Sequence, residues 1–505
     1  MPTMEEIIPD CLPGEGQRFW RRAKVSREQW QSVTKALAAE DVTLLGLWGE
    51  QGAVYMAVLD EADAAVWLLS LDCPDGRFPS VGRLHAPAQR LERTIADLYG
   101  LEAEGGADLR PWLDHGRWGL RRPLSACPGA AEAMAAYSFL PAEGQSLHVI
   151  PVGPVHAGII EPGHFRFTAN GETVVRLEER LGYVHKGVEG LMVGADLKQA
   201  SKLAARVSGD ATVAYSFAFA RAVEAALAIE VPARAVWLRA LMAELERLAN
   251  HFGDIGAVCN DASFSLMQAH CSVLREKVLR TAALCFGHRL MMDRIQPGGV
   301  ACDLDSEHLA TIRALLDEAR HRFPRLAELY DNTASLKDRT VGTGHLSPAL
   351  ARRFGAGGFV GRASGRGFDC RRSLAYAPYD EMLFGAPVVH RGDVNARVWV
   401  RIVEVGQSLG LIEQILDGLS EGPVRVDTVR GAGVASEGLA LVESFRGDVL
   451  VWVRLDEDGK VLRCHLRDPS WFQWPLLEAV IEGNIVADFP LCNKSFNCSY
   501  SGHDL

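Results

Sequence analysis

The sequence predicts an α+β protein, with a small α/β N-terminal domain and a large, mainly helical bundle domain flanked by small β-sheets. The chain has 505 residues, which is too long for one compact core. Its first part mixes helical segments with short β-rich runs. Its later parts contain long stretches in which apolar residues recur at helical spacing. We therefore expect a domain over residues 1–120, a linker over 121–147 and a second domain over 148–505.

The N-terminal domain is expected to begin with a helix over residues 27–39. Three β-rich runs follow, at residues 42–48, 54–59 and 64–71. Beyond them, Leu91, Ile95 and Leu98 lie on one face of a predicted helix. The linker is rich in Pro, Gly and Ala, a composition that suits an irregular segment, although part of it can form a helix.

The second domain is expected to open with strands at residues 164–168 and 172–177 and then to become helical. Helices are predicted at residues 196–229, 238–252, 262–293, 305–330 and 393–418. The last part returns to a hairpin, with strands at 449–455 and 461–466. The most apolar stretch, residues 211–229, is interrupted by Arg221 and Glu224, which predicts a buried helix and not a membrane span.

Charge, the first residues and the cysteines limit what kind of protein this is. The net charge of −11 and the lack of a basic tract argue against nucleic-acid binding. The first residues lack the basic start and apolar core of a signal peptide, so we expect a cytoplasmic chain. The 11 cysteines form no Cys-x-x-Cys pair and are expected to be reduced.

The residues alone offer little metal or nucleotide chemistry. No HExxH motif occurs, and Cys492 and Cys498 are six residues apart, which suits two ordinary cysteines. The glycine-rich segments 355–361 and 431–436 do not complete a dinucleotide-binding fingerprint, so structural turns are the better interpretation. A nucleotide-dependent dehydrogenase is therefore disfavoured.

One Gly/Pro-rich loop, residues 153–162, carries both His156 and Glu161 just before a predicted strand. Such loops can direct side chains into a cleft. Glu161, if buried, would have a raised pKa and act as a proton relay. The alternative is a plain loop with a hydrogen-bonded histidine.

Ordered motifs across the chain resemble a known family. Residues from about 150 onward are similar to the large subunit of group 4 nickel–iron hydrogenases and to the 49-kDa subunit of complex I. The motifs are Gly153-Pro-Val-His156, Gly182-Tyr-Val-His185-Lys-Gly-Val-Glu189, Glu244-Leu-Glu-Arg247-Leu-Ala-Asn-His251, Asp338-Arg-Thr340, Arg362-Ala-Ser-Gly365, Tyr379-Asp-Glu381, Glu443-Ser-Phe-Arg446-Gly447 and Arg467-Asp468-Pro-Ser470. The segments 92–100 and 108–113 resemble the 30-kDa subunit of complex I. As a whole, the chain resembles the fused large subunits of formate hydrogenlyase and hydrogenase-4 complexes.

The resemblance also locates a metal site whose ligands are absent. The family supplies two Cys-x-x-Cys pairs, and the corresponding positions here are Ser208, Ala211, Ser499 and Gly502. Nickel–iron sites need soft thiolate ligands, so we expect no metal and no cofactor bound directly by this chain.

Other positions depart from the patterns of both the quinone-reducing and the hydrogenase-type members of the family. Ile160 and Gly209 stand where quinone-reducing members have His and Tyr, and Tyr215 replaces an expected His. The sequence ends two residues after His503, with no extension for a maturation protease to remove. We expect from this a protein that is never metallated.

The resemblance implies a subunit of a membrane-associated, complex I-like oxidoreductase, peripheral on the inner face of the cell membrane. Its partners would be an iron–sulfur small subunit, which holds iron–sulfur clusters, and antiporter-like membrane subunits. Electron transfer would be coupled to quinone or to proton or ion translocation. The alternative is a non-catalytic scaffold joining these partners, with a vestigial cavity.

In the first case the former metal cavity would be a cleft for another electron acceptor or for a quinone held differently. Three residues would be catalytic: Glu161 as proton relay, Arg206 as positive anchor, and His156. Five further residues would line the cleft: Ser208, Asp210, Tyr215, Ser499 and His503.

Overall fold

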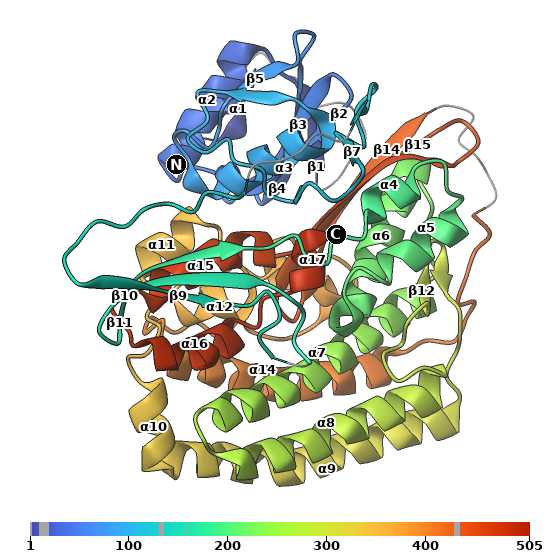
Figure 1. Cartoon of the computed structure of the whole chain (residues 1–505). Helices are drawn as coiled ribbons and strands as arrows, with labels where there is room; N and C mark the ends of the chain where they lie inside the picture. Colours follow the sequence, from blue (N-terminus) through green and yellow to red (C-terminus); the bar gives the residue numbers. More distant parts are fainter. Residues whose placement is uncertain (1–2, 10–19, 131–135, 158, 429–434) are drawn as a thin grey trace.

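The structure is a computed structural model, and it describes residues 3–9, 20–130, 136–157, 159–428 and 435–505. Two units lie one above the other, with the smaller N-terminal unit at the top of Figure 1. The α+β class predicted from the sequence is confirmed. The C-terminal end of the chain lies between the two units.

The N-terminal unit is built on a four-stranded sheet with the order β1-β4-β3-β2. The strands are β1 (Trp20–Lys24), β2 (Thr43–Glu50), β3 (Ala53–Asp60) and β4 (Ala65–Asp72). Helices α1 (Met4–Ile7), α2 (Arg27–Ala38), η1 (Ala86–Ala88) and α3 (Gln89–Tyr99) accompany the sheet. Leu91, Ile95 and Leu98 are buried on one face of α3, as their spacing predicts. A short parallel pair joins β5 (Arg77–Pro79) and β6 (Glu102–Glu104).

The connection between the units holds only short strands among its described residues, β7 (Leu120–Arg121) and β8 (Gly129–Ala130). No helix forms in the described part of 121–147. A three-stranded antiparallel sheet with the order β11-β10-β9 follows. Its strands are β9 (Leu147–Val152), β10 (His164–Asn170) and β11 (Thr173–Arg180), so the two strands expected here are confirmed.

The second unit is mainly helical, with α7 and α14 through its centre and α8 and α9 at its base (Figure 1). The long helices are α6 (Thr212–Leu227), α7 (Ala233–Asp261), α8 (Ser265–Phe286), α9 (Ser306–Asn332) and α14 (Val394–Gly418). Shorter ones are α4 (Val188–Met192), α5 (Leu197–Ala204), η2 (Gly209–Ala211), α10 (Ala334–Thr340), α11 (Pro348–Arg353), α12 (Gly358–Ala363), α13 (Cys370–Ser373) and η3 (Tyr379–Glu381). A two-stranded pair joins β12 (Ile295–Gln296) and β13 (Gly299–Val300).

The helix expected over 196–229 is in fact broken into α5, η2 and α6. Helix α5 ends at Ala204, and Ser208, just before η2, takes an extended conformation with φ −144° and ψ 122°. The apolar helix α6 is buried against β14 and β15. Among the helices in the described ranges, none is long and apolar enough to cross a membrane.

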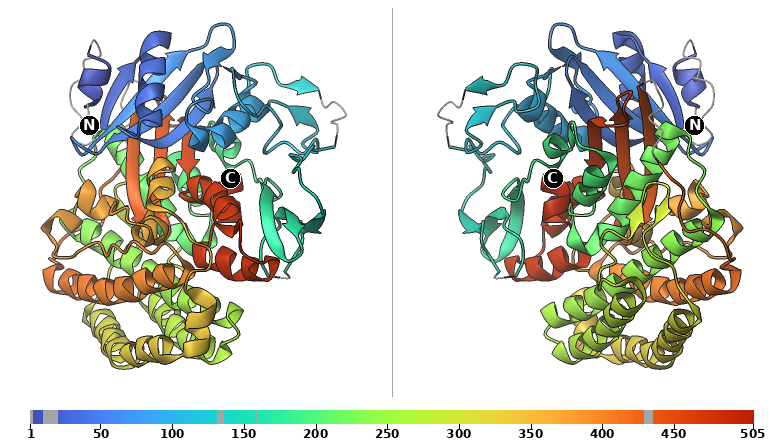
Figure 2. Two further views of the ribbon diagram at one scale, coloured as in Figure 1. Left: turned by 90° about the vertical axis from the view of Figure 1, so that its left-hand side faces the viewer. Right: turned by 90° about the vertical axis from the view of Figure 1, so that its right-hand side faces the viewer.

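The C-terminal part forms an antiparallel sheet with the order β14-β15-β16, which includes the predicted hairpin. Its elements are β14 (Ser436–Ser444), β15 (Gly447–Leu455), β16 (Val461–Arg467), α15 (Ser470–Ile481), η4 (Val486–Asp488), α16 (Phe489–Phe496) and α17 (Tyr500–Asp504). Figure 2 shows these strands standing against the N-terminal sheet. Trp48 of β2 stacks on His465 of β16, with ring centroids 4.4 Å apart, so the two sheets share a core.

The first glycine-rich segment has a structural role. Gly358 begins α12 at φ +58°, and a Cβ added there would lie 2.1 Å from the carbonyl oxygen of Arg446. Only glycine permits this close approach. The second segment lies mostly outside the described residues, at 429–434.

Candidate functional site

The two segments that should carry metal ligands meet in space although they are far apart in sequence. Ser208 precedes η2, and Ser499 is the N-cap of α17. Their hydroxyl oxygens are 3.1 Å apart, and both side chains are buried. The Ser208 hydroxyl also donates to an Asp210 carboxylate oxygen at 2.7 Å, and the Ser499 hydroxyl accepts from the Gly502 N–H at 2.9 Å. The hydroxyls therefore bind each other and their own local turns.

The other two positions offer no donor and leave little space. Ala211 is 1% exposed and contributes only a methyl group to the core. A Cβ added to Gly502 would lie 2.4 Å from a carboxylate oxygen of Asp468. The Tyr215 hydroxyl donates to this same oxygen at 2.7 Å. Burial, and then the Asp468 charge, raise the pKa of Tyr215 well above its usual value, so this phenol stays protonated.

The positive charge beside the two serines comes from Arg446, at the turn between β14 and β15. Its guanidinium makes two hydrogen bonds to Asp210, at 2.9 and 2.6 Å, and donates to the Asn497 carbonyl. Burial alone would raise the pKa of Asp210, but the Arg446 charge and the hydrogen bonds hold it at about 2. This pair therefore remains ionised at any physiological pH.

Arg206, the residue expected to supply that positive charge, does not join this cluster. Its side chain is 46% exposed and makes two hydrogen bonds to Asp293, at 2.6 and 2.8 Å. Arg206 lies in the turn after α5, where its guanidinium also donates to the Lys202 carbonyl at 2.8 Å. Arg206 thus lies apart from the other predicted residues.

The loop between β9 and β10 brings His156 and Glu161 to the start of α17. Glu161 is exposed, and its carboxylate accepts from the Ser501 N–H at 3.0 Å. His156 Nε2 lies 3.3 Å from the Tyr500 hydroxyl, and partial burial lowers the pKa of this imidazole. The burial that would make Glu161 an interior proton relay is therefore absent.

His503 faces the N-terminal unit and not the serine pair. It is fully buried, stacks on Trp471 at 4.0 Å and has its Nδ1 atom 2.8 Å from Asp504. The Trp112 indole N–H donates to His503 Nε2 at 3.3 Å, which fixes the tautomer with the proton on Nδ1. Burial lowers the pKa of His503, although Asp504 opposes the effect.

Glu246 of α7 is a buried acid beside the cluster that the sequence did not single out. Its carboxylate accepts from the N–H groups of Val213 and Ala214, at 2.7 and 3.1 Å, at the start of α6. Burial raises the pKa of Glu246 to about 8, with a contribution from the nearby Asp210 charge. Arg446, Asp468 and Glu246 all occur in or beside the sequence motifs quoted above. Their place in these motifs is the sequence feature that could have pointed to them.

The residues present do not fit a nickel–iron centre. Such a centre needs four soft sulfur ligands, whereas these positions supply two hydroxyls that are already bonded, a methyl group and a glycine. Within the described ranges, no group of three or more His, Cys, Asp or Glu side chains is placed to hold a metal ion. The thiols of Cys492 and Cys498 are buried, which raises both pKa values, that of Cys492 to about 12.

Comparison with known proteins identifies the family. Residues 23–126 match the family model of the respiratory-chain NADH dehydrogenase 30 Kd subunit, and residues 261–437 and 430–504 match that of the 49 Kd subunit. Formate hydrogenlyase subunit 5 of Escherichia coli K12 is 31% identical over 468 residues, which cover 90% of this chain and 82% of that protein. The chain belongs to the fused 30-kDa/49-kDa complex I-like family.

One further relative and one solved structure are also similar to this complex I-like chain. Hydrogenase-4 component G of Escherichia coli K12 is 32% identical over 470 residues, covering 90% of this chain and 80% of that protein. A chain in the structure of the membrane-bound sulfane sulfur reductase, an archaeal respiratory membrane complex, superposes with a TM-score of 0.67. It is 26% identical and matches 72% of this chain and 99% of its own length.

Proposed function

We propose that this chain is a subunit of a membrane-associated, complex I-like oxidoreductase and holds no nickel–iron centre of its own. Its family membership supports the first part, because relatives are components of formate hydrogenlyase, of hydrogenase-4 and of an archaeal respiratory membrane complex. The second part depends on the serine pair. Ser208 and Ser499 bind each other where the family resemblance expects thiolates.

The partners that we propose are an iron–sulfur subunit, which carries the clusters, and antiporter-like membrane subunits at the inner face of the cell membrane. In this arrangement electrons pass through the partner, and this chain contributes groups that hold or move protons. Glu246 supports that role, since a carboxyl with a pKa of about 8 changes charge near neutral pH. Asp210 keeps its charge through its pair with Arg446, and this charge contributes to the raised pKa of Glu246.

A second candidate function is a non-catalytic scaffold between the same partners. The observation that favours it is that the polar groups of the serine cluster are already hydrogen-bonded within the chain. The Ser208, Ser499 and Tyr215 hydroxyls each bond within the chain, and Gly502 packs directly against Asp468. In a scaffold these bonds only stabilise the junction of η2, α17 and β16.

The test is purification of the native complex from its source through an N-terminal tag on this chain. Nickel is then measured by elemental analysis, and turnover is assayed with hydrogen, formate and quinone. We expect nickel well below about one atom per complex, since hydroxyl and methyl groups cannot replace thiolates. Stoichiometric nickel bound to this chain would refute the proposal.

One pair of variants separates the two candidates. Glu246→Gln removes the titrating group, whereas Glu437→Gln changes a carboxylate that pairs with Arg22 at the far side of β14. If the chain handles protons, turnover by the assembled complex falls by about tenfold or more in Glu246→Gln only. Equal turnover in both variants, with assembly intact, would favour the scaffold.

A further inference from the structure

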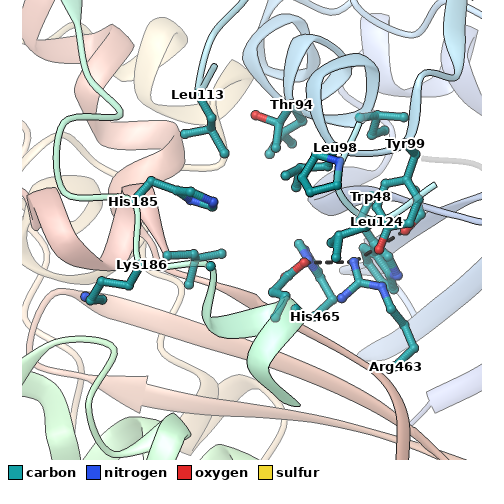
Figure 3. A pocket seen from close by; sticks show the side chains of 18 of the residues that line it. Trp48, Thr94, Leu98, Tyr99, Leu113, Leu124, His185, Lys186, Arg463 and His465 are labelled. Atoms are coloured by element: carbon teal, nitrogen blue, oxygen red, sulfur yellow. Dashed lines mark hydrogen bonds and ion pairs between the residues drawn. The ribbon is translucent and has the colours of Figure 1, made fainter. Parts of the chain in front are cut away.

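A cavity of about 700 Å³ lies between the two units, apart from the serine cluster. Residues of β2 and α3 line it from the N-terminal side, and residues of α4 and β16 line it from the other side. Figure 3 shows Thr94 and Leu98 on one side of this space and His465 and Arg463 on another. None of the eight site residues predicted from the sequence lines it, so it is a separate feature of the molecule.

The size and lining of this interdomain cavity are those of a small-molecule site. Binding pockets usually have volumes of about 300–1,000 Å³ and are mostly apolar, with a few polar groups that orient the ligand. Leucine side chains make up much of the lining, and three tryptophans, Trp48, Trp118 and Trp471, add flat aromatic surface. At the rim, Leu191 is 57% exposed and Leu120 is 38% exposed, so the entrance is apolar as well.

The charged groups of the lining are matched within the protein. Glu189 binds Arg463 at 2.8 Å and His465 Nδ1 at 2.7 Å. Burial opposes ionisation of Glu189, yet these two partners lower its pKa to about 2. The Lys186 ammonium donates to the Val207 carbonyl at 2.9 Å, and Figure 3 shows this side chain pointing away from the cavity. Since Arg463 and Glu189 pair with each other and Lys186 is directed elsewhere, a charged ligand would gain no counter-ion here and would lose its hydration.

Hydrogen-bonding capacity nevertheless remains at one wall. The His185 side chain is part of the lining, and Figure 3 shows its ring pointing toward the space between the two sides. Its Nδ1 atom lies 2.7 Å from the Asp504 carbonyl oxygen, which can only accept, so Nδ1 donates there. The Nε2 atom is then left to form a hydrogen bond with a ligand at this wall.

We propose that this interdomain cavity binds one small, uncharged, largely apolar molecule with a hydrogen-bonding group at one end. The apolar part lies against the leucines and tryptophans, and the polar end lies near His185. Because both units contribute to the lining, a bound molecule stabilises their relative placement. The proposal does not depend on the proposed function, which concerns other residues.

The test uses the full chain and Nile red, an uncharged apolar dye whose fluorescence rises in apolar surroundings. We expect saturable binding at a single class of site, with quenching of tryptophan emission. The anionic dye 1-anilinonaphthalene-8-sulfonate should bind at least about tenfold more weakly, because it would have to lose its hydration without a counter-ion. Tighter binding of the anionic dye would overturn the requirement for an uncharged ligand.

Two matched pairs of variants locate the binding site. Leu191→Glu places a carboxylate at the rim, whereas Val193→Glu does so at a residue of similar exposure, 53%, outside the lining. Thr94→Trp fills the cavity from α3, and Ala96→Trp adds the same ring at an exposed position of that helix. Leu191→Glu and Thr94→Trp should weaken Nile red binding by about fivefold or more, and the controls should retain it.

The variants are first checked for unchanged circular dichroism and thermal unfolding, so that a loss of binding reports on the cavity. Loss of Nile red binding in both members of each pair would overturn the proposal, as would non-saturable binding to the unmodified chain. Retention of binding in Thr94→Trp would overturn it too, because the dye would then occupy another place.

Discussion

At the residue scale, Gly502 decides what the serine cluster can hold. The space that a side chain would need is taken by the Asp468 carboxylate, which also binds Tyr215. We predict that Gly502→Ala lowers the free energy of unfolding by about 1–3 kcal/mol, the usual cost of overpacking a buried site. Urea unfolding measures the change.

The matched control for Gly502 is Gly209, in the neighbouring turn. A Cβ added there meets no atom within 4 Å, and its φ lies outside the left-handed region. Gly209→Ala should therefore change stability by less than about 0.5 kcal/mol. If the two variants were equally stable, the Asp468 carboxylate would not limit the space at position 502.

Glu246 gives a prediction for the pH dependence of stability. Burial raises its pKa to about 8 in the folded chain, against about 4.3 in an unfolded one. Between these values the folded state binds the extra proton, so stability falls as pH rises through this window. One such group contributes a slope of at most about −1.4 kcal/mol per pH unit. Glu246→Gln should lose this slope, measured by urea unfolding from pH 5 to pH 8.

The titration of Glu246 is judged from the slope of stability against pH and not from absolute stability. The Gln variant changes absolute stability as well, because it replaces one acceptor oxygen with a donor beside the Val213 and Ala214 N–H groups. The comparison variant is Glu437→Gln, at a part-exposed carboxylate paired with Arg22. An identical slope in the wild type and Glu246→Gln would show that this carboxyl is ionised throughout the range.

Residue-level prediction from the sequence succeeded unevenly. The meeting of positions 208 and 499 followed from the family resemblance, since 291 residues separate them and no local pattern joins them. Arg446 and Asp468 lay inside quoted motifs, but their side-chain directions depend on partners distant in sequence. The same holds for Arg206, whose partner Asp293 lies 87 residues away.

At the scale of elements, α17 and η2 are held together by the two serines. Ser499 caps α17, whereas the Ser208 side chain makes no cap bond to η2. We predict that Ser499→Ala costs about 1–2 kcal/mol and Ser208→Ala less. A double-mutant cycle should give a coupling of about 0.5–1.5 kcal/mol for the hydroxyl pair. Additive effects of the two substitutions would mean that the hydroxyls do not interact.

Elements with strong local periodicity were predictable, and elements that depend on distant pairing were not. The helices around residues 238–252, 305–330 and 393–418 form because apolar residues recur at helical spacing. Strand β1 was missed because it pairs in parallel with β4, some 45 residues later, and has no partner nearby. The break between α5 and α6 was missed because α5 ends at Ala204 with no glycine or proline there to mark its end.

At the scale of the whole molecule, an arginine of α3 joins the two units. Arg90 contacts two carboxylates of the second unit, the buried Glu179 at 3.3 Å and the part-buried Glu478 at 2.7 Å. Its guanidinium also lies 4.4 Å from the centre of the Trp112 ring, which in turn contacts His503. Burial and the mutual repulsion of the carboxylates raise the pKa of Glu179 well above its usual value. Arg90 therefore stabilises the junction of the two units, because without its positive charge the two carboxylates would lie close together with no cation between them.

We predict that Arg90→Ala lowers the free energy of unfolding by about 3 kcal/mol or more, because it leaves the buried Glu179 and the part-buried Glu478 without their cation. Arg27→Ala is the control, since Arg27 pairs with Glu104 at the surface, where such pairs contribute less than about 1 kcal/mol. Thermal unfolding provides the measurement. Equal stability of the two variants would mean that the units are held together by the β2–β16 contact and not by Arg90.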